Sequence, residues 1–141
     1  MKFSKISSTA RWVRRECANV FHTLNPASRR KAAKWEAENG PDCLRRIGIK
    51  SGDFVLDFGC GPGRFSISAA QLVGAMGQVY AIDSNPSVLW KVRRKADALG
   101  LQNIRTAGSL AELARLPGAR RYDVALAFDM LHFLDTPARN R

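Results

Sequence analysis

One short segment constrains the fold of this 141-residue chain more than any other: an apolar run that ends in a glycine loop. Residues 55–58 are apolar except for Asp57, and three glycines follow at alternate positions: Gly59, Gly61 and Gly63. The run has the composition of a central parallel strand, which is apolar on both faces. Glycines lack Cβ atoms, so a ligand can approach the loop closely, and a helix expected from about Arg64 would direct its N-terminal amides at that ligand. The segment therefore predicts a cradle for a nucleotide-type cofactor.

The glycine spacing distinguishes between the loops that bind nucleotides. A dinucleotide fingerprint requires G-x-G-x-x-G, and Arg64 occupies the place of its third glycine. A phosphate-binding P-loop requires Gly-Lys-Ser/Thr, which does not follow Gly63. The spacing therefore argues against a nicotinamide-dependent oxidoreductase, an alternative that tight binding of NAD would revive.

Two further apolar segments follow at spacings typical of alternating strands and helices. Residues 79–82 lead into Asp83, 22 residues after Gly61, and residues 122–128 lead into a helix-like turn. A carboxylate at the end of such a strand can accept hydrogen bonds from ribose hydroxyls. Helices are expected over 64–74, 86–99 and 109–116, with a short strand over 103–106 between the last two. This alternation predicts an α/β fold with a doubly wound, mostly parallel sheet.

Taken together, these motifs resemble the class I (Rossmann-like) S-adenosylmethionine-dependent methyltransferases. The similarity rests on G-x-G-x-G preceded by Asp57, on Asp83, and on the strand over 122–128, and it covers about residues 48–135. It implies S-adenosyl-L-methionine as cofactor and methyl transfer as activity. In such enzymes the cofactor brings the reactive methyl group, so most identifiable residues should bind cofactor and position the acceptor.

The resemblance assigns roles to the residues of these motifs. The glycine loop should lie against the methionine and ribose portion, Asp57 should orient the loop and the cofactor amino group, and Asp83 should hold the ribose hydroxyls. Cys60 is interpreted as a small residue in a tight turn, in preference to a reactive thiol. The full set of implied cofactor contacts is Asp57, Gly59, Cys60, Gly61, Gly63, Asp83, Ser84, Asn85, Ser109, Leu110 and Phe128.

Ser109 and His132 each have two possible roles. Ser109, next to Leu110, stands where many members of the family carry an acid that accepts the adenine amino group, and a neutral hydroxyl makes a weaker bond than a carboxylate. His132 is a candidate general base for the acceptor. It falls in a Leu-His sequence of the family that also serves helix packing, so this second reading stays open.

The length of the chain departs from the family pattern. Members typically contain seven strands, whereas motifs for four are present here, which suggests a truncation after the fourth. The fourth strand would then form an exposed edge that invites self-association or a partner. The alternative to an enzyme is therefore a non-catalytic S-adenosylmethionine-binding module that needs a partner.

Charge gives a weaker indication of the acceptor. The net charge is +11, and residues 1–50 carry 12 Lys or Arg against 4 acids. Such a field attracts nucleic acid or anionic lipid, so an RNA- or DNA-directed methyltransferase that grips phosphates with its N-terminal third is one alternative. A small-molecule acceptor is preferred, because residues 131–134 resemble the small-molecule members of the family.

The N-terminal third is expected to form a basic helical extension over residues 1–47, before a cofactor-binding domain over 48–141. Helical spacing predicts an amphipathic helix over about 6–24, and a second helix from Ser28 should stop at Gly40-Pro41. Three cysteines without metal-ligand spacing predict neither a metal site nor a disulfide framework, and they suit a cytoplasmic protein. No transmembrane segment is expected.

Overall fold

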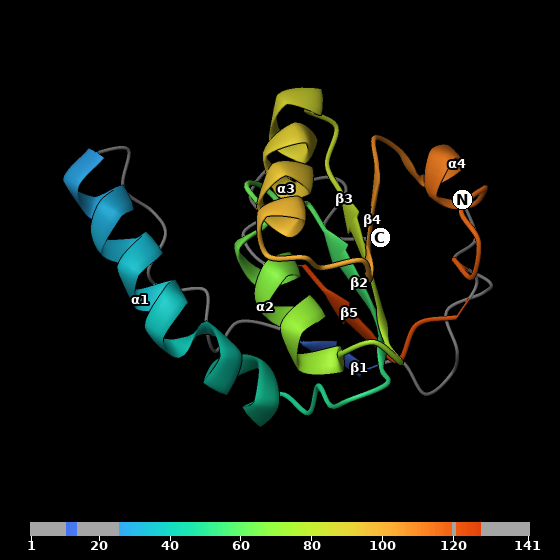
Figure 1. Cartoon of the computed structure of the whole chain (residues 1–141), viewed down its shortest axis with the longest axis horizontal. Helices are drawn as coiled ribbons and strands as arrows, with labels where there is room; N and C mark the ends of the chain where they lie inside the picture. Colours follow the sequence, from blue (N-terminus) through green and yellow to red (C-terminus); the bar gives the residue numbers. More distant parts are fainter. Residues whose placement is uncertain (1–10, 14–25, 120, 128–141) are drawn as a thin grey trace, which may run out of the picture.

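The computed structural model describes residues 11–13, 26–119 and 121–127 of the chain (Figure 1). Strands alternate with helices along most of this length, as the sequence predicts. The elements are β1 (Arg11–Val13), α1 (Pro26–Arg46), β2 (Phe54–Phe58), α2 (Arg64–Val73), β3 (Gln78–Ile82), α3 (Pro86–Ala98), β4 (Ile104–Ala107), α4 (Leu110–Leu113) and β5 (Val124–Leu126).

The strands form one parallel sheet in the order β1-β5-β2-β3-β4. At its centre Leu56 pairs with Tyr80 of β3 on one side and Ala125 of β5 on the other. The chain runs outward from β2 to β3 and β4, and then returns to place β5 on the opposite side of β2. The expected doubly wound α/β architecture is thus confirmed, and β2 lies at the point where the strand order reverses.

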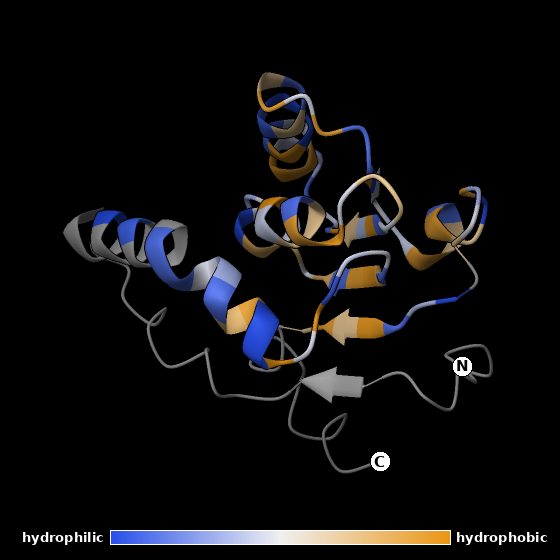
Figure 2. Cartoon of the chain, turned by 60° about the horizontal axis from the view of Figure 1, so that its bottom comes forward, coloured by the Kyte–Doolittle hydropathy of each residue, from blue (hydrophilic) through white to orange (hydrophobic). Residues whose placement is uncertain are grey.

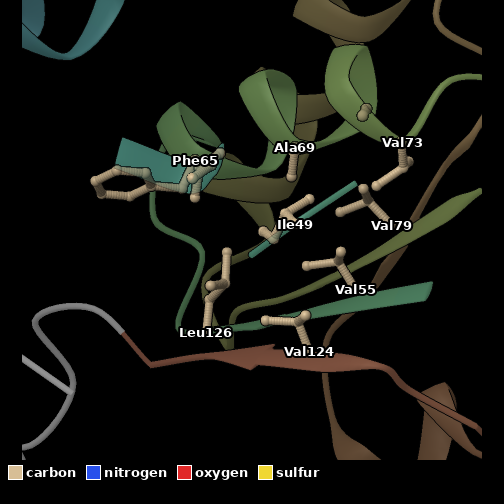
Figure 3. Close-up of a cluster of buried hydrophobic side chains, with 10 residues drawn as sticks. Ile49, Val55, Phe65, Ala69, Val73, Val79, Val124 and Leu126 are labelled. Atoms are coloured by element: carbon tan, nitrogen blue, oxygen red, sulfur yellow. The ribbon is translucent and has the colours of Figure 1, made fainter. Parts of the chain in front are cut away.

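One face of the sheet packs against α1, α2 and α3. Alternate strand residues such as Val55, Val79 and Val124 point to this face and are fully buried. In Figure 3, Phe65, Ala69 and Val73 of α2 lie over these valines. In Figure 2, the strands β2, β3 and β5 are mostly hydrophobic, whereas the described residues of α1 are mostly hydrophilic.

The opposite face carries α4. Leu56, Tyr80 and Ile82 point to this side and form a second buried cluster with Leu113 of α4. The ring of Tyr80 meets Tyr122 edge to face, with a centroid distance of 5.6 Å, and its hydroxyl donates to the Pro117 carbonyl at 2.7 Å. Because both faces are covered, the strands are apolar in near-continuous runs.

The predicted stop at Gly40-Pro41 is wrong, because α1 continues through both residues to Arg46. Proline inside a helix removes one backbone hydrogen bond and crowds the preceding turn. Packing against α2 offsets this cost, since Leu44 is fully buried in the core that α2 covers. Gly40 is buried as well, and a Cβ built there would lie 3.5 Å from the Ser68 hydroxyl of α2.

The amphipathic helix predicted over 6–24 is also wrong for residues 11–13, which form β1 (residues 6–10 and 14–24 lie outside the described residues). β1 runs parallel to β5, with Arg11 opposite Val124 and Val13 opposite Leu126. The edge of β5 that was expected to be exposed is therefore paired along these residues. An unpaired strand edge presents free N–H and C=O groups, which a short segment from elsewhere in the chain can satisfy.

Two further expectations concern the cysteines and the membrane. Cys43 is disulfide-bonded, so the prediction that the chain lacks disulfides is wrong for this residue, and cysteine usage no longer indicates a reducing compartment. Cys60 is free and buried. None of the helices in the described ranges is long and apolar enough to cross a membrane.

The burial of Leu44 gives a test of how firmly α1 is docked. Leu44→Ala should lower the free energy of unfolding by about 2–5 kcal/mol, because it removes a fully buried side chain and leaves a cavity. Met76→Ala is the matched control, since Met76 is 82% exposed. Urea unfolding followed by circular dichroism measures both. A Leu44→Ala chain as stable as the control would mean that α1 contributes little to the core.

Candidate cofactor-binding site

The glycine loop lies at the carboxyl end of β2 and is tied to the neighbouring strand. The amides of Gly59 and Cys60 both donate to the Ile82 carbonyl at the end of β3, at 2.8 and 2.9 Å. The end of β3 is tied in turn to β4, because the amide of Asp83 donates to the Ala107 carbonyl at 3.2 Å. The carboxyl ends of three strands thus form one edge, at the switch point where open α/β sheets bind ligands.

All three loop glycines have the left-handed backbone conformation, with φ of 75° at Gly59, 51° at Gly61 and 76° at Gly63. Other residues adopt this conformation at a cost. A Cβ at Gly61 would meet no atom within 4 Å, so the loop faces open space there. Gly63 is different, because a Cβ there would lie 2.7 Å from Val92 Cγ2 of α3. One glycine therefore leaves room for a ligand, and another allows α3 to pack closely.

Asp83 connects the glycine loop to the start of α3. Its Oδ2 accepts a hydrogen bond from the Gly61 amide at 3.1 Å, and its Oδ1 accepts one from the Asn85 amide at 2.9 Å. The Asn85 side chain caps α3 by accepting from the Ser87 amide at 3.0 Å. Ser84 and Asn85 are exposed and Asp83 is half-buried. Each carboxylate oxygen has a second lone pair, so Asp83 can still accept from hydroxyls of a ligand.

Asp57 lies behind the loop and is almost fully buried. Its Oδ2 accepts a hydrogen bond from the Ser66 hydroxyl of α2 at 2.5 Å. Burial raises the pKa of Asp57 to about 6; the bond from Ser66 opposes this shift, and the negative charge of Asp83 adds to it. Asp57 thus links β2 to the first turn of α2 and keeps a carboxyl group next to the loop.

Cys60 occupies the middle of the loop as a buried thiol. Its Sγ donates to the Gly61 carbonyl at 3.5 Å. Burial, then the charges of Asp57 and Asp83, raise the pKa of the Cys60 thiol. A thiolate is the reactive form of cysteine, and this environment disfavours it. The geometry favours the interpretation of Cys60 as a small packed residue.

Ser109 follows β4 at the same edge and begins α4. Its hydroxyl accepts from the Glu112 amide at 3.1 Å, while Oε2 of Glu112 accepts from the Gly108 amide at 2.6 Å. The arrangement resembles a capping box, for which S-x-x-E is the sequence signal, except that Glu112 accepts from the Gly108 amide and not from the amide of the N-cap residue Ser109. Sequence reasoning missed Glu112, which brings a carboxylate one turn beyond Ser109. Ser109 is exposed, and Leu110 is half-buried against the cluster that contains Tyr80.

A second residue that sequence reasoning missed is Lys95 of α3. Its ammonium group donates to the Pro62 carbonyl in the glycine loop at 2.9 Å. Together with the packing of Val92 on Gly63, this bond holds the loop against α3. No local pattern reveals such a contact, because 33 residues separate its partners.

The remaining predicted site residues, Phe128 and His132, lie outside the described residues. Within the described ranges, no group of three or more His, Cys, Asp or Glu side chains could hold a metal ion. The structure therefore brings the predicted loop glycines together with Asp57, Asp83 and Ser109 at one edge of the sheet, and the cofactor contacts of these residues stay predictions.

The two kinds of loop glycine can be separated by mutation. Gly61→Ala should lower stability by about 1–2 kcal/mol through backbone strain alone. Gly63→Ala carries similar strain and also drives a methyl group into Val92, which adds about 1–3 kcal/mol. Thermal unfolding of both variants measures the difference, and Val92→Ala should restore part of the loss in Gly63→Ala only. Equal losses in the two variants would contradict the close contact.

Asp57 should leave a signature in the pH dependence of stability. Since its pKa rises from 3.8 to about 6 on folding, the folded chain holds a proton in this pH window that the unfolded chain has released. The ionisation of Asp57 therefore lowers stability as the pH rises through the window. Asp57→Asn cannot ionise, so its free energy of unfolding relative to wild type should increase by roughly 2 kcal/mol from pH 4 to pH 7. Urea unfolding at several pH values measures this, and a constant difference would contradict the raised pKa.

The chain is similar to known proteins in sequence and in fold. A family model described as a methyltransferase domain matches residues 55–141, which is more than half of the chain. A probable cobalt-precorrin-6B C(15)-methyltransferase (decarboxylating) of Saccharolobus solfataricus is 43% identical over 60 residues, covering 43% of this chain and 30% of the relative. A demethylmenaquinone methyltransferase of Geobacillus stearothermophilus is 33% identical over 76 residues, covering 54% of this chain and 31% of the relative.

Solved structures give the same result. A SAM-dependent methyltransferase from Aquifex aeolicus superimposes with a TM-score of 0.52 at 30% identity, over 67% of this chain and 51% of that one. The chain spans less than half the length of the curated relatives it matches. The parallel sheet, the glycine loop at its switch point and the family match lead to one conclusion: the chain belongs to the class I S-adenosylmethionine-dependent methyltransferases.

Proposed function

We propose that this chain binds S-adenosyl-L-methionine at the carboxyl edge of β2, β3 and β4 and takes part in methyl transfer to a small-molecule acceptor. The observation that carries the proposal is the position of Asp83. Its carboxylate follows β3 directly and bonds to the Gly61 amide, so an acceptor of hydroxyl protons lies beside an open glycine loop. This combination suits a ligand with a ribose next to an apolar or zwitterionic portion.

The residues of the site fit such a ligand. Gly61 has no neighbour where a side chain would stand, so the loop backbone can contact the cofactor directly. Asp83 would accept from the ribose hydroxyls, and exposed Ser84 and Asn85 would lie along the adenine. Bound S-adenosylmethionine would supply a methyl group on a sulfonium, and the contribution of the chain is to bind, to orient and to exclude water.

Asp57 would contribute from behind the loop. Its bond to Ser66 holds the loop against the first turn of α2, where the amides carry partial positive charge. When ionised, it would also attract the positively charged amino group of the cofactor. Since its pKa is about 6, most of this attraction would be present at neutral pH and would weaken as the pH falls below 6.

A small-molecule acceptor is supported by the relatives. Their names state that they act on cobalt-precorrin-6B, demethylmenaquinone and aklanonic acid. All are organic molecules that a pocket beside the cofactor could hold. The acceptor pocket itself is expected to include residues beyond β5, in the part of the family match that follows Leu126.

A second candidate function is a cofactor-binding module that does not catalyse transfer by itself. It is supported by the geometry of the loop, Asp57 and Asp83, because these residues could bind the cofactor without any transfer. Such a module would bind S-adenosylmethionine at the same edge and need another polypeptide for the acceptor.

Calorimetric titration with S-adenosylhomocysteine tests the cofactor site. The wild-type chain should bind, and Asp83→Ala should weaken binding by about 10–100-fold, because charge-assisted hydrogen bonds to the ligand are lost. Asp97→Ala, an exposed acid on α3, is the matched control and should bind as wild type. Absence of binding by a folded wild-type chain, or unchanged affinity in Asp83→Ala, would contradict the proposal.

Methyl transfer then separates the two candidate functions. The chain is incubated with S-adenosylmethionine labelled in its methyl group and with a panel of small phenolic, quinone and tetrapyrrole acceptors. Transfer that is lost in Asp83→Ala supports the enzyme. Binding of the cofactor without transfer to any acceptor supports the module.

A further inference from the structure

The outer surface of α3 carries a concentration of positive charge that the cofactor site does not use. Four of its thirteen residues are basic, and Asp97 is its one acid. The apolar residues Leu89, Val92 and Ala96 are buried against the sheet, so the basic residues point outward. The exposed charged and aromatic residues on this side are Trp90, Lys91, Arg93, Arg94, Lys95 and Asp97.

One of these cations also ties α3 to the edge of the sheet. Arg93 donates from Nη1 to the Thr106 hydroxyl of β4 at 2.9 Å, which joins α3 to the edge strand. Arg105, next to Thr106, points to the opposite face of the sheet, on the side of Tyr80, and does not belong to this surface. We define the α3 basic face as the residues Trp90, Lys91, Arg93 and Arg94.

Asp97 is exposed on the same side of α3, three residues after Arg94, but within the described residues it forms no ion pair, and the surface keeps a net positive charge. On α1, by contrast, Arg45 pairs with Asp42 at 2.6 Å and Lys34 with Glu38 at 3.8 Å. Within the described part of the chain, Lys91 and Arg94 form no such pair. A surface with a net positive charge attracts a polyanion, because binding releases the counterions of that polyanion.

An exposed aromatic ring lies in the middle of these cations. Trp90 is 53% exposed, although tryptophan is usually well buried. The guanidinium carbon of Arg94 lies 5.1 Å from the centroid of its ring. A tryptophan with an adjacent arginine offers a flat surface for stacking, and stacking on aromatic rings between cations is how proteins hold unpaired bases.

We propose that the α3 basic face binds single-stranded nucleic acid. Lys91 and Arg94 would contact phosphates, and a base would stack on Trp90. The proposal goes beyond the methyl transfer proposed above and does not depend on it. It also differs from the expectation based on the N-terminal third of the sequence, since α3 lies outside that third.

An anionic membrane is the other polyanion to consider, and the packing of α3 argues against it. A helix that lies on a membrane buries an apolar face in the lipid. The apolar face of α3 is already buried, and Trp90 is the one large apolar side chain among the residues of the α3 basic face. Contact through cations and one aromatic ring suits a nucleic acid better.

Fluorescence anisotropy with a labelled oligouridylate tests the proposal at a series of salt concentrations. The wild-type chain should bind in a salt-dependent manner. The double variant Lys91→Glu/Arg94→Glu should bind at least tenfold more weakly and with a smaller salt slope. Trp90→Ala should lose about tenfold in affinity with an unchanged salt slope, because it removes stacking and no charge.

Arg115→Glu is the matched control, since Arg115 is exposed and follows α4 on the opposite face of the sheet. It should bind within about twofold of wild type. All positions changed are exposed, and circular dichroism checks that each variant is folded. The proposal is overturned by an affinity unaffected by the double variant, by an equal loss in the control, or by binding to phosphatidylserine vesicles without binding to the oligonucleotide. S-adenosylhomocysteine titration of the double variant shows separately whether the cofactor site is intact.

Discussion

The hydrogen bonds that tie the glycine loop to the end of β3 determine most of what surrounds them. Two amides of the loop share the Ile82 carbonyl, and the next free amide, that of Gly61, bonds to Asp83. This pattern forces the chain through three left-handed residues and points it into α2. It also fixes where α3 begins, because the second oxygen of Asp83 holds the Asn85 amide. The sheet, both flanking helices and the candidate site therefore share one small network at the edge of β2 and β3.

Much of this network could be predicted from the sequence, because its signals are local. A run that is apolar on both faces, a glycine loop, and Asn-Pro at a helix start each specify one element by themselves. Helix α2, expected over 64–74, spans Arg64–Val73, and α3, expected over 86–99, spans Pro86–Ala98. The position of Asp83 beside the loop could also be predicted from the sequence, because Asp83 follows a strand directly and the carboxyl ends of parallel strands share an edge.

The errors and omissions arise from contacts between distant residues. Helix α1 continues through Pro41 because Leu44, in its last turn, is buried in the core that α2 covers. Strand β1 pairs with β5, which lies more than a hundred residues later in the chain. The bonds of Ser66 to Asp57 and of Lys95 to Pro62 likewise join different elements. Local propensity contains no information about such partners. Contacts between elements are therefore where sequence reasoning failed, and two of them, Ser66 to Asp57 and Lys95 to Pro62, lie at the candidate site.

The bonds of Asp83 have one more consequence. Because this carboxylate already holds both the loop and the start of α3, the loop has one defined shape without a ligand. For the cofactor binding proposed above, association would then require little ordering of the backbone, and more of the contact energy would be available as affinity. The edge of the sheet would act as a preorganised template for the cofactor.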